Sequence, residues 1–301
     1  MKNSKLNKIL ITFIISFVFN SLSAQQLTFK DQIDQIAKEA KGDVGVALLN
    51  LEAGDTFLYN ETMHFPMQSV YKFPLAMAVL SQIDAGKLTI DQKLHLTKRD
   101  LLPNTWSPLR EKYPNANVDV TLMEVLKATV SESDNNGCDI LFRLLGGPKK
   151  VEKYIHGIGV KEIAIAATEE EMHTAWDVQF TNWCTPVAMQ QLLSTFHKDD
   201  KLSEKSKQLL WDMMVDSPTG AKRIKALLPE GTVVAHKTGT SDTNKEGVTG
   251  AINDVGIIVL PNKHHLAITV FVANSKASTG IMEETIAKIA KAAYDNEINK
   301  Q

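Results

Sequence analysis

The chain has 301 residues, of which 44% are hydrophobic and 23% are charged, and its formal net charge is −2. This length and composition are typical of a soluble globular protein with one large domain or two closely packed ones. The slightly negative charge argues against nucleic acid or an anionic membrane as the main partner.

The first 24 residues differ from the rest of the chain. Three lysines precede the apolar run ILITFIISFVF, and SLSA then offers small residues before Gln25. This pattern predicts a secretory signal peptide over residues 1–24, cleaved near Ala24. The apolar run is short for a membrane-spanning helix, so we expect no stable membrane anchor after processing. Loss of the three lysines would take the formal charge from −2 to −5.

The elements that follow change in type along the chain. Apolar residues at helical spacing predict an amphipathic helix over residues 27–41, and residues 45–60 read as a β-hairpin. From Ser69 to about Val215 the signals are mostly helical; they are LAMAVLSQIDAG, TLMEVLKATVS, GCDILFRLLGG and TPVAMQQLLSTFH. Three β-branched runs then predict strands, namely GTVVAHKTGT, GAINDVGIIVL and HLAITVFVAN. A helix from about residue 280 to 296 ends the chain.

Strands near both ends, with helices between them, imply an α/β (α+β) fold whose sheet is assembled from the two termini. We expect residues 25–66 and 216–301 to form a sheet lobe with flanking helices, and residues 67–215 to form an all-helical lobe. Short turns between the late strands make the sheet antiparallel. The two lobes would form one unit, with a small-molecule site in the cleft between them.

The cysteines and histidines indicate no cofactor chemistry. Cys138 and Cys184 form no CxxC pair; a single disulfide is conceivable, but we expect both thiols to be buried and unpaired. The eight histidines show no HExxH or similar spacing, so the sequence predicts no metal site. His264 and His265, close to Pro261, are interpreted as part of a turn between strands.

A first chemical motif lies at the start of the helical region. Ser69 and Lys72 stand one helical turn apart at the head of a long apolar stretch. Backbone N–H groups at a helix N-terminus stabilise an oxyanion, and a buried lysine on the same face accepts a serine proton more readily. The pair is also compatible with a helix cap followed by a lysine with a buried stem.

Two further motifs follow later in the chain. Ser133-Asp134-Asn135 comes just after a predicted helix, and Lys237-Thr238-Gly239 lies on a predicted strand. Alone, the first would be a helix cap or Asx turn and the second a surface lysine. Together with Ser69 and Lys72, they resemble the active-site set of class A serine β-lactamases and penicillin-binding proteins. The resemblance spans essentially the whole chain after the signal segment and implies a serine β-lactamase/DD-peptidase-like fold.

This resemblance implies a role for each residue. Ser69 would attack the lactam carbonyl and form an acyl-enzyme, and Lys72 would assist proton transfer. Ser133 would pass the proton to the lactam nitrogen, and Asn135 would hold the amide of the substrate side chain.

The KTG strand would bind the other side of the substrate. Lys237 and Thr238 would hold the substrate carboxylate, and the backbone N–H groups of Ser69 and Thr240 would form the oxyanion hole. The remaining substrate-binding residues on this strand would be Gly239 and Ser241.

Residues 167–183, ATEEEMHTAWDVQFTNW, resemble the omega loop of the same family. The alignment makes Glu169 the base that activates water for deacylation, although three consecutive glutamates alone would be a solvated charge run. Glu170 stands where the family has proline, so the cis peptide expected there is in doubt. His173 replaces an asparagine that helps to hold the water.

The neck of this loop also departs from the family. Ala167 and Asn182 stand at the places of an arginine and an aspartate that clamp it, so we expect a different loop conformation. These changes resemble the PER/VEB/CfxA-like branch of extended-spectrum cephalosporinases. In that branch an arginine at the place of Arg223 lies near the KTG strand and helps to bind the substrate carboxylate. Trp106 matches an aromatic residue at the cleft mouth, or is a half-buried packing residue.

The resemblance therefore implies a hydrolase of β-lactam antibiotics that favours cephalosporins, confers resistance and uses no cofactor or metal. The signal segment predicts a periplasmic location, and we expect a monomer because nothing in the sequence marks an oligomer interface. Two alternatives share the acylation step. One is a DD-peptidase or penicillin-binding protein, and the other is a slow, acylatable β-lactam sensor. Both would lack turnover that depends on Glu169.

Overall fold

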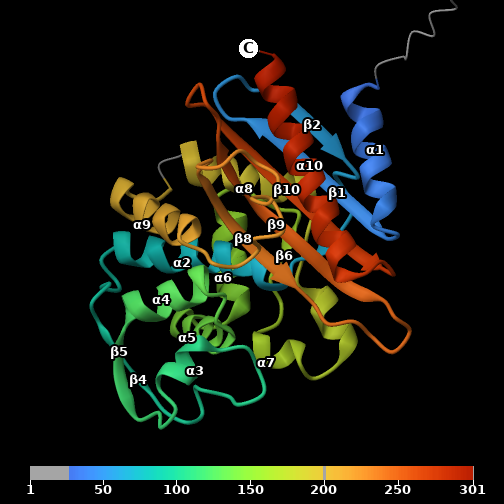
Figure 1. Ribbon diagram of the computed structural model, residues 1–301. Helices are drawn as coiled ribbons and strands as arrows, with labels where there is room; N and C mark the ends of the chain where they lie inside the picture. The colour runs from blue at the N-terminus through green and yellow to red at the C-terminus, as the bar shows by residue number, and fades with distance from the viewer. Residues whose placement is uncertain (1–26, 199–200, 301) are drawn as a thin grey trace, which may run out of the picture.

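The computed structural model describes residues 27–198 and 201–300 (Figure 1). Its main sheet has five antiparallel strands in the order β2-β1-β10-β9-β8. Their bounds are Asp43–Asn50 (β1), Thr56–Tyr59 (β2), Val234–Thr240 (β8), Thr249–Val259 (β9) and His265–Ser275 (β10). Strand β1 pairs with β10 from Asp43 opposite Ala273 to Asn50 opposite Leu266. The prediction of an antiparallel sheet built from both chain ends is confirmed.

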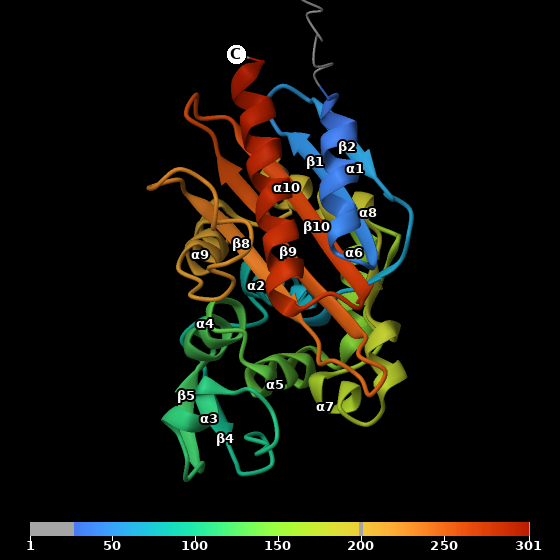
Figure 2. The same cartoon turned by 45° about the vertical axis from the view of Figure 1, so that its right-hand side comes forward.

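Two helices from opposite ends of the chain cover one face of this sheet. Helices α1 (Phe29–Glu39) and α10 (Thr279–Asn299) lie side by side over it (Figure 2). A capping box between Thr28 and Asp31 begins α1, and its apolar stripe places Ile33 and Ala37 in the core. These helices and the β-branched residues of the strands form one continuous apolar layer.

The other face of the sheet carries the helices of the middle of the chain. The central helix, α2 (Lys72–Asp84), is buried from Lys72 through Leu80, as expected for a helix that is apolar on every side. The helices around it are α4 (Leu122–Ser131), α5 (Asn135–Leu145), α6 (Pro148–Gly157), α8 (Pro186–Lys198) and α9 (Glu204–Val215). Their side chains form a second core that includes an edge-to-face contact between Phe73 and Phe196.

Short elements, which sequence periodicity does not reveal, complete the structure. Four of them are strands within the described part of residues 67–215, so this part of the chain is mostly helical and not all-helical as predicted. One small sheet has the order β3-β7-β6, with β3 at Phe65–Pro66, β6 at Ile163–Ala164 and β7 at Trp183–Cys184. Another pairs β4 (Lys93–Leu96) with β5 (Val118–Thr121). The helical pieces are η1 (Gln68–Tyr71), α3 (Pro108–Lys112), α7 (Glu169–Met172) and η2 (Trp176–Thr181). The first small sheet brings both ends of the 165–182 loop next to the chain that enters η1.

Two sequence predictions concern the cysteines and the membrane. Cys138 and Cys184 are both buried and unpaired, as predicted. The predicted signal peptide lies outside the described residues. Within residues 27–198 and 201–300, none of the helices combines the length and apolar character needed to cross a bilayer.

Candidate active site

Ser69 lies in the short 3₁₀ helix η1, which leads into α2. The preceding residue, Gln68, has φ of 50°, an uncommon value for a residue other than glycine. Strand β8 passes directly beside η1. The two backbones are so close that a Cβ atom at Gly239 would collide with the backbone carbonyl of Met67. Glycine in the KTG motif therefore allows the strand to approach the serine closely.

Lys72 lies at the centre of the site, and its ammonium group interacts with four other described residues. Its side chain is fully buried, and Nζ donates hydrogen bonds to Ser69 Oγ at 2.9 Å, Ser133 O at 2.8 Å and Asn135 Oδ1 at 2.5 Å. Glu169 Oε1 is a fourth neighbour at 2.9 Å and interacts as an ion pair, since an ammonium has only three N–H donors. The candidate nucleophile and the candidate base thus meet at one cation.

Lys237 brings a second cation to the same place from strand β8. Its Nζ donates to Ser133 Oγ at 2.9 Å and to Thr238 O at 3.0 Å. Burial is the largest cause that lowers the pKa of Lys237 well below its usual value, and repulsion from Lys72 is the second. Ser133 has φ of 60°, a strained conformation that directs its hydroxyl to Lys237 and its carbonyl to Lys72.

The SDN turn is anchored by its middle residue. Asp134 is fully buried, caps α5 by accepting from Gly137 N at 2.7 Å, and accepts further bonds from Ser107 Oγ and Leu109 N. Asn135 next to it donates to Thr105 Oγ1 at 2.6 Å. The amide of Asn135 is therefore held between Lys72 and the 102–107 loop.

Arg223 lies beside the KTG strand but is turned into the protein. Its guanidinium donates to Gly239 O at 3.0 Å, Asn253 O at 2.9 Å and Thr240 Oγ1 at 2.7 Å, and it pairs with Glu283 at 3.3 Å. Only 5% of the residue is exposed. Among the described residues, Arg223 therefore makes no direct hydrogen bond into the cleft, and its hydrogen bond to Thr240 Oγ1 is its link to a carboxylate bound there.

The neck of the 165–182 loop is closed by one side chain. Asn182 Oδ1 accepts from Ala166 N at 2.7 Å and Ala167 N at 2.9 Å, and its Nδ2 donates to Ala167 O at 2.9 Å. Its backbone carbonyl accepts from Met67 N at 2.9 Å. An uncharged amide thus connects the two ends of the loop and ties them to the segment before Ser69.

The three consecutive glutamates of the loop have different environments. Thr168 and Glu171 form a capping box that begins α7, and Glu170 is exposed. Glu169 points inward and is only 6% exposed. No cis peptide bond occurs in the described residues, so the 169–170 bond is trans, in line with the doubt raised by Glu170.

Asp139 on α5 supports the backbone of this helix. Its two carboxylate oxygens accept from Glu169 N at 2.8 Å and Glu170 N at 2.9 Å. Burial raises the pKa of Asp139 to about 6, although these hydrogen bonds act against the shift. His173 donates from Nδ1 to Glu169 O at 2.6 Å. The position of Glu169 is therefore set by contacts to its backbone on both sides.

A cleft of about 710 Å³ opens above Ser69. Its walls include five of the predicted binding residues, which are Trp106, Asn135, His173, Thr240 and Ser241, together with the predicted catalytic residues Ser69 and Glu169. Trp106 is 59% exposed, with its indole N–H bonded to Glu132 O, so it lies at the mouth rather than half-buried in the core. Lys72, Lys237 and Arg223 lie behind this surface.

Comparison with known proteins agrees with this arrangement. A family model described as the β-lactamase enzyme family matches residues 28–296. The chain is 45% identical to β-lactamase VEB-1 of Pseudomonas aeruginosa, over 97% of both chains. The crystal structure of TLA-1 extended-spectrum β-lactamase is 54% identical with a TM-score of 0.88, over 90% of this chain and 98% of that one. A reconstructed ancestral class A β-lactamase is 30% identical with a TM-score of 0.82, over 89% and 100%.

This chain belongs to the β-lactamase enzyme family. Its fold is that of the class A enzymes, as the three motifs implied. The positions at which the enzyme's omega loop departs from the usual family pattern resemble the PER/VEB branch, and this agrees with the similarity to VEB-1.

Several residues that shape the cleft of this β-lactamase were absent from the sequence-based set. Gln68 donates to Gln179 Oε1 at 2.7 Å and so links the residue before the nucleophile to η2. Thr105 and Trp176 line the cleft. The pairing of Gln68 with Gln179 joins positions far apart in the chain, and no local spacing marks it. Trp176 lies within the predicted omega loop, and that location was the one feature of the sequence that could have indicated a place in the cleft.

Proposed function

We propose that this enzyme opens the β-lactam ring through an acyl-enzyme on Ser69, releases the product with Glu169, and favours cephalosporins. The observation that carries the proposal is the shared contact of Lys72 with Ser69 Oγ and Glu169 Oε1, each at 2.9 Å. A nucleophile that forms an ester and a carboxylate that hydrolyses it are thereby held within one buried cluster.

Acylation uses the groups around Ser69. Its hydroxyl attacks the lactam carbonyl carbon, the C–N bond breaks, and the proton of the hydroxyl ends on the lactam nitrogen. Lys72 Nζ is positioned to help move this proton, and Ser133 Oγ is positioned to donate at the nitrogen. The backbone N–H groups of Ser69 and Thr240 stabilise the negative charge on the carbonyl oxygen.

Substrate orientation depends on charge at one end of the cleft and on an amide at the other. The substrate carboxylate binds at Lys237 with the hydroxyls of Thr238 and Thr240, and an anion there favours the charged form of Lys237. Asn135 binds the side-chain amide. Arg223 holds Thr240 in place and adds positive charge behind it.

Deacylation requires water activated next to the ester. Glu169 accepts a proton from that water, the hydroxide attacks the ester carbonyl, and Ser69 recovers its proton as the product leaves. The inward position of Glu169 favours a hydrolase over a DD-peptidase or a slow sensor, which would keep the acyl group.

The preference for cephalosporins rests on the shape of the cleft and on similarity. Its volume of about 710 Å³ and its two tryptophans, Trp106 and Trp176, offer space and apolar surface for a bulky side chain. TLA-1, with the same fold, is described as an extended-spectrum β-lactamase. We further infer export to the periplasm through residues 1–24, action as a monomer, and a role in antibiotic resistance.

A turnover assay tests this proposal. Nitrocefin added in large excess over the protein should be consumed at many equivalents per chain, and cephalosporins should show a higher kcat/KM than penicillins. Bleaching of one equivalent followed by arrest would instead identify a DD-peptidase or a sensor. A preference for penicillins would overturn the substrate assignment alone.

A further inference from the structure

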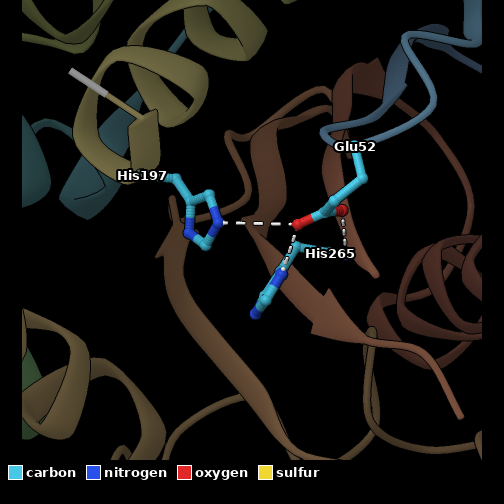
Figure 3. A group of neighbouring side chains, drawn as sticks. All are labelled: Glu52, His197 and His265. Carbon is cyan, nitrogen blue, oxygen red and sulfur yellow. Dashed lines mark hydrogen bonds and ion pairs between the residues drawn. The ribbon is translucent and has the colours of Figure 1, made fainter. Parts of the chain in front are cut away.

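A second cluster of chemically active side chains lies outside the catalytic cleft. It consists of Glu52, His197 and His265, whose nearest ligand atoms all lie within 4.8 Å of one another (Figure 3). Glu52 is in the turn after β1, His197 is in the last turn of α8, and His265 is the first residue of β10. Three segments far apart in the sequence therefore bring their side chains to one point.

The carboxylate of Glu52 is oriented by the backbone. Its Oε2 accepts from the backbone N–H of His265 at 2.6 Å, and its Oε1 accepts from the imidazole Nδ1 of His265 at 2.8 Å. The Nε2 atom of His197 lies 3.9 Å from the same Oε1. The two imidazole rings are 4.3 Å apart between centroids. One oxygen thus faces both rings while the other is fixed by a main-chain bond.

We propose that Glu52, His197 and His265 form a binding site for a transition-metal dication of the Zn²⁺ type. Two imidazole nitrogens and one carboxylate oxygen are a donor set that zinc takes in proteins. Ligands of a tetrahedral zinc ion at about 2.0–2.1 Å are about 3.3 Å apart. The two separations from Glu52 Oε1, 2.8 and 3.9 Å, lie on either side of this value, and the histidine nitrogens lie within 4.8 Å of each other, so rotation of the histidine side chains would bring all three ligands to one ion.

The surroundings leave room for a fourth ligand. A cavity of about 340 Å³ adjoins the two histidines and is also lined by Trp211, Gln208 and Lys207. The positive charge of Lys207 is balanced at its rim by Glu204, 2.5 Å away. A water molecule or a small anion on the metal would occupy this cavity. A metal bound at His265 Nδ1 would replace the hydrogen bond between this atom and Glu52 Oε1.

A bound metal would add a direct link between three segments that are far apart in the sequence. It would link the β1–β2 turn to the end of α8 and the start of β10. The C-terminal end of α10 lies close by, where Glu297 accepts from Asn50 at 2.7 Å. The loop that carries α7 and Glu169 lies at the opposite end of the molecule (Figure 1). We therefore expect the metal to raise stability without supplying a catalytic group.

Calorimetric titration with zinc chloride tests the site, using the chain without a histidine tag. The wild type should bind one equivalent. At a hundredfold excess over Kd, zinc should raise the melting midpoint by about 5 °C, and chelation should reverse the rise. The double variant His197→Ala/His265→Ala should bind at least tenfold more weakly and lose the rise in midpoint.

A matched control separates this trio from an ordinary histidine–carboxylate pair. His95 Nδ1 contacts Asp119 at 2.7 Å, and within residues 27–198 and 201–300 no other group of three such ligands comes together, so His95→Ala should bind zinc as the wild type does. Nitrocefin turnover reports folding of every variant, because His197 and His265 lie outside the catalytic cleft. Absence of binding in the wild type, or equal binding in the folded double variant, would overturn the proposal.

Discussion

The centre around Lys72 and the loop that carries Glu169 are built differently, although they meet at one ion pair. The centre is formed by motif residues on a buried helix, a capped turn and the edge strand β8, and Lys72 and Lys237 are fully buried. The loop is held by a few bonds between side chains and backbone, chiefly from Asn182 and Asp139. Acylation thus depends on the rigid part, and deacylation depends on attachments that single substitutions remove.

The largest effect is expected in the rigid centre. Ser69→Ala should lower kcat/KM for nitrocefin by roughly 10⁴-fold or more, because the acyl-enzyme has no oxygen on which to form. Circular dichroism should show an unchanged fold, since Ser69 lies on the cleft surface. Substantial turnover by this variant would mean that another group is the nucleophile.

Removal of the second cation should have a smaller effect. Lys237→Ala should raise KM for carboxylate-bearing cephalosporins by roughly 10- to 100-fold, because a fixed cation facing the carboxylate is lost. The matched control is the methyl ester of the same cephalosporin, whose KM should change little. Equal changes for acid and ester would remove the carboxylate-binding role from Lys237.

The loop attachment is tested at its neck. Asn182→Ala leaves two backbone N–H groups without their acceptor and should lower the deacylation rate constant by about 10-fold, more than it lowers acylation. Asn182→Asp keeps the acceptor and loses the amide donor to Ala167 O and Met172 Sδ, so its effect should be smaller. Rapid-mixing kinetics separate the two steps. A larger effect on acylation would contradict the division between centre and loop.

Asp139 should add a pH dependence of modest size. Its folded-state pKa of about 6 lies above the ordinary 3.8, so the folded protein binds more protons between these values, and its contribution to stability falls as the pH rises from 4 to 7. The difference amounts to about 3 kcal/mol. Asp139→Asn loses this dependence. Urea unfolding should therefore show the variant gaining on the wild type as the pH rises, and a constant difference would contradict the assigned pKa.

Much of the fold could be predicted because its signals are local. Each element is specified within a short stretch of sequence, by the hairpin pattern at residues 45–60, by β-branched runs or by helical spacing. Strands of two residues, such as β3, β6 and β7, have no period to detect. Their pairing depends on contacts between Phe65, Ile163 and Cys184 that only the folded chain brings together.

The residues of the site also fall into those that the sequence could predict and those that it could not. Ser69, Lys72 and the SDN and KTG motifs could be found because each is a short run of neighbouring residues and the three together resemble a known active-site set. The contacts of Asn182 could not, since the loss of a charged clamp indicates a change without indicating its replacement. The burial of Arg223 and the meeting of Glu52 with His265 likewise depend on tertiary packing. His265 was interpreted as part of a turn, and it begins β10 instead.

The most direct test of the account is the fate of the acyl-enzyme when Glu169 is removed. Mass spectrometry of Glu169→Ala after exposure to a cephalosporin should show one stable adduct per chain, located on Ser69. Glu170→Ala, a change at the exposed neighbouring glutamate, should turn over substrate as the wild type does and show no lasting adduct. Normal turnover by Glu169→Ala, or an adduct that persists equally in both variants, would contradict the assignment of Glu169 as the deacylating base.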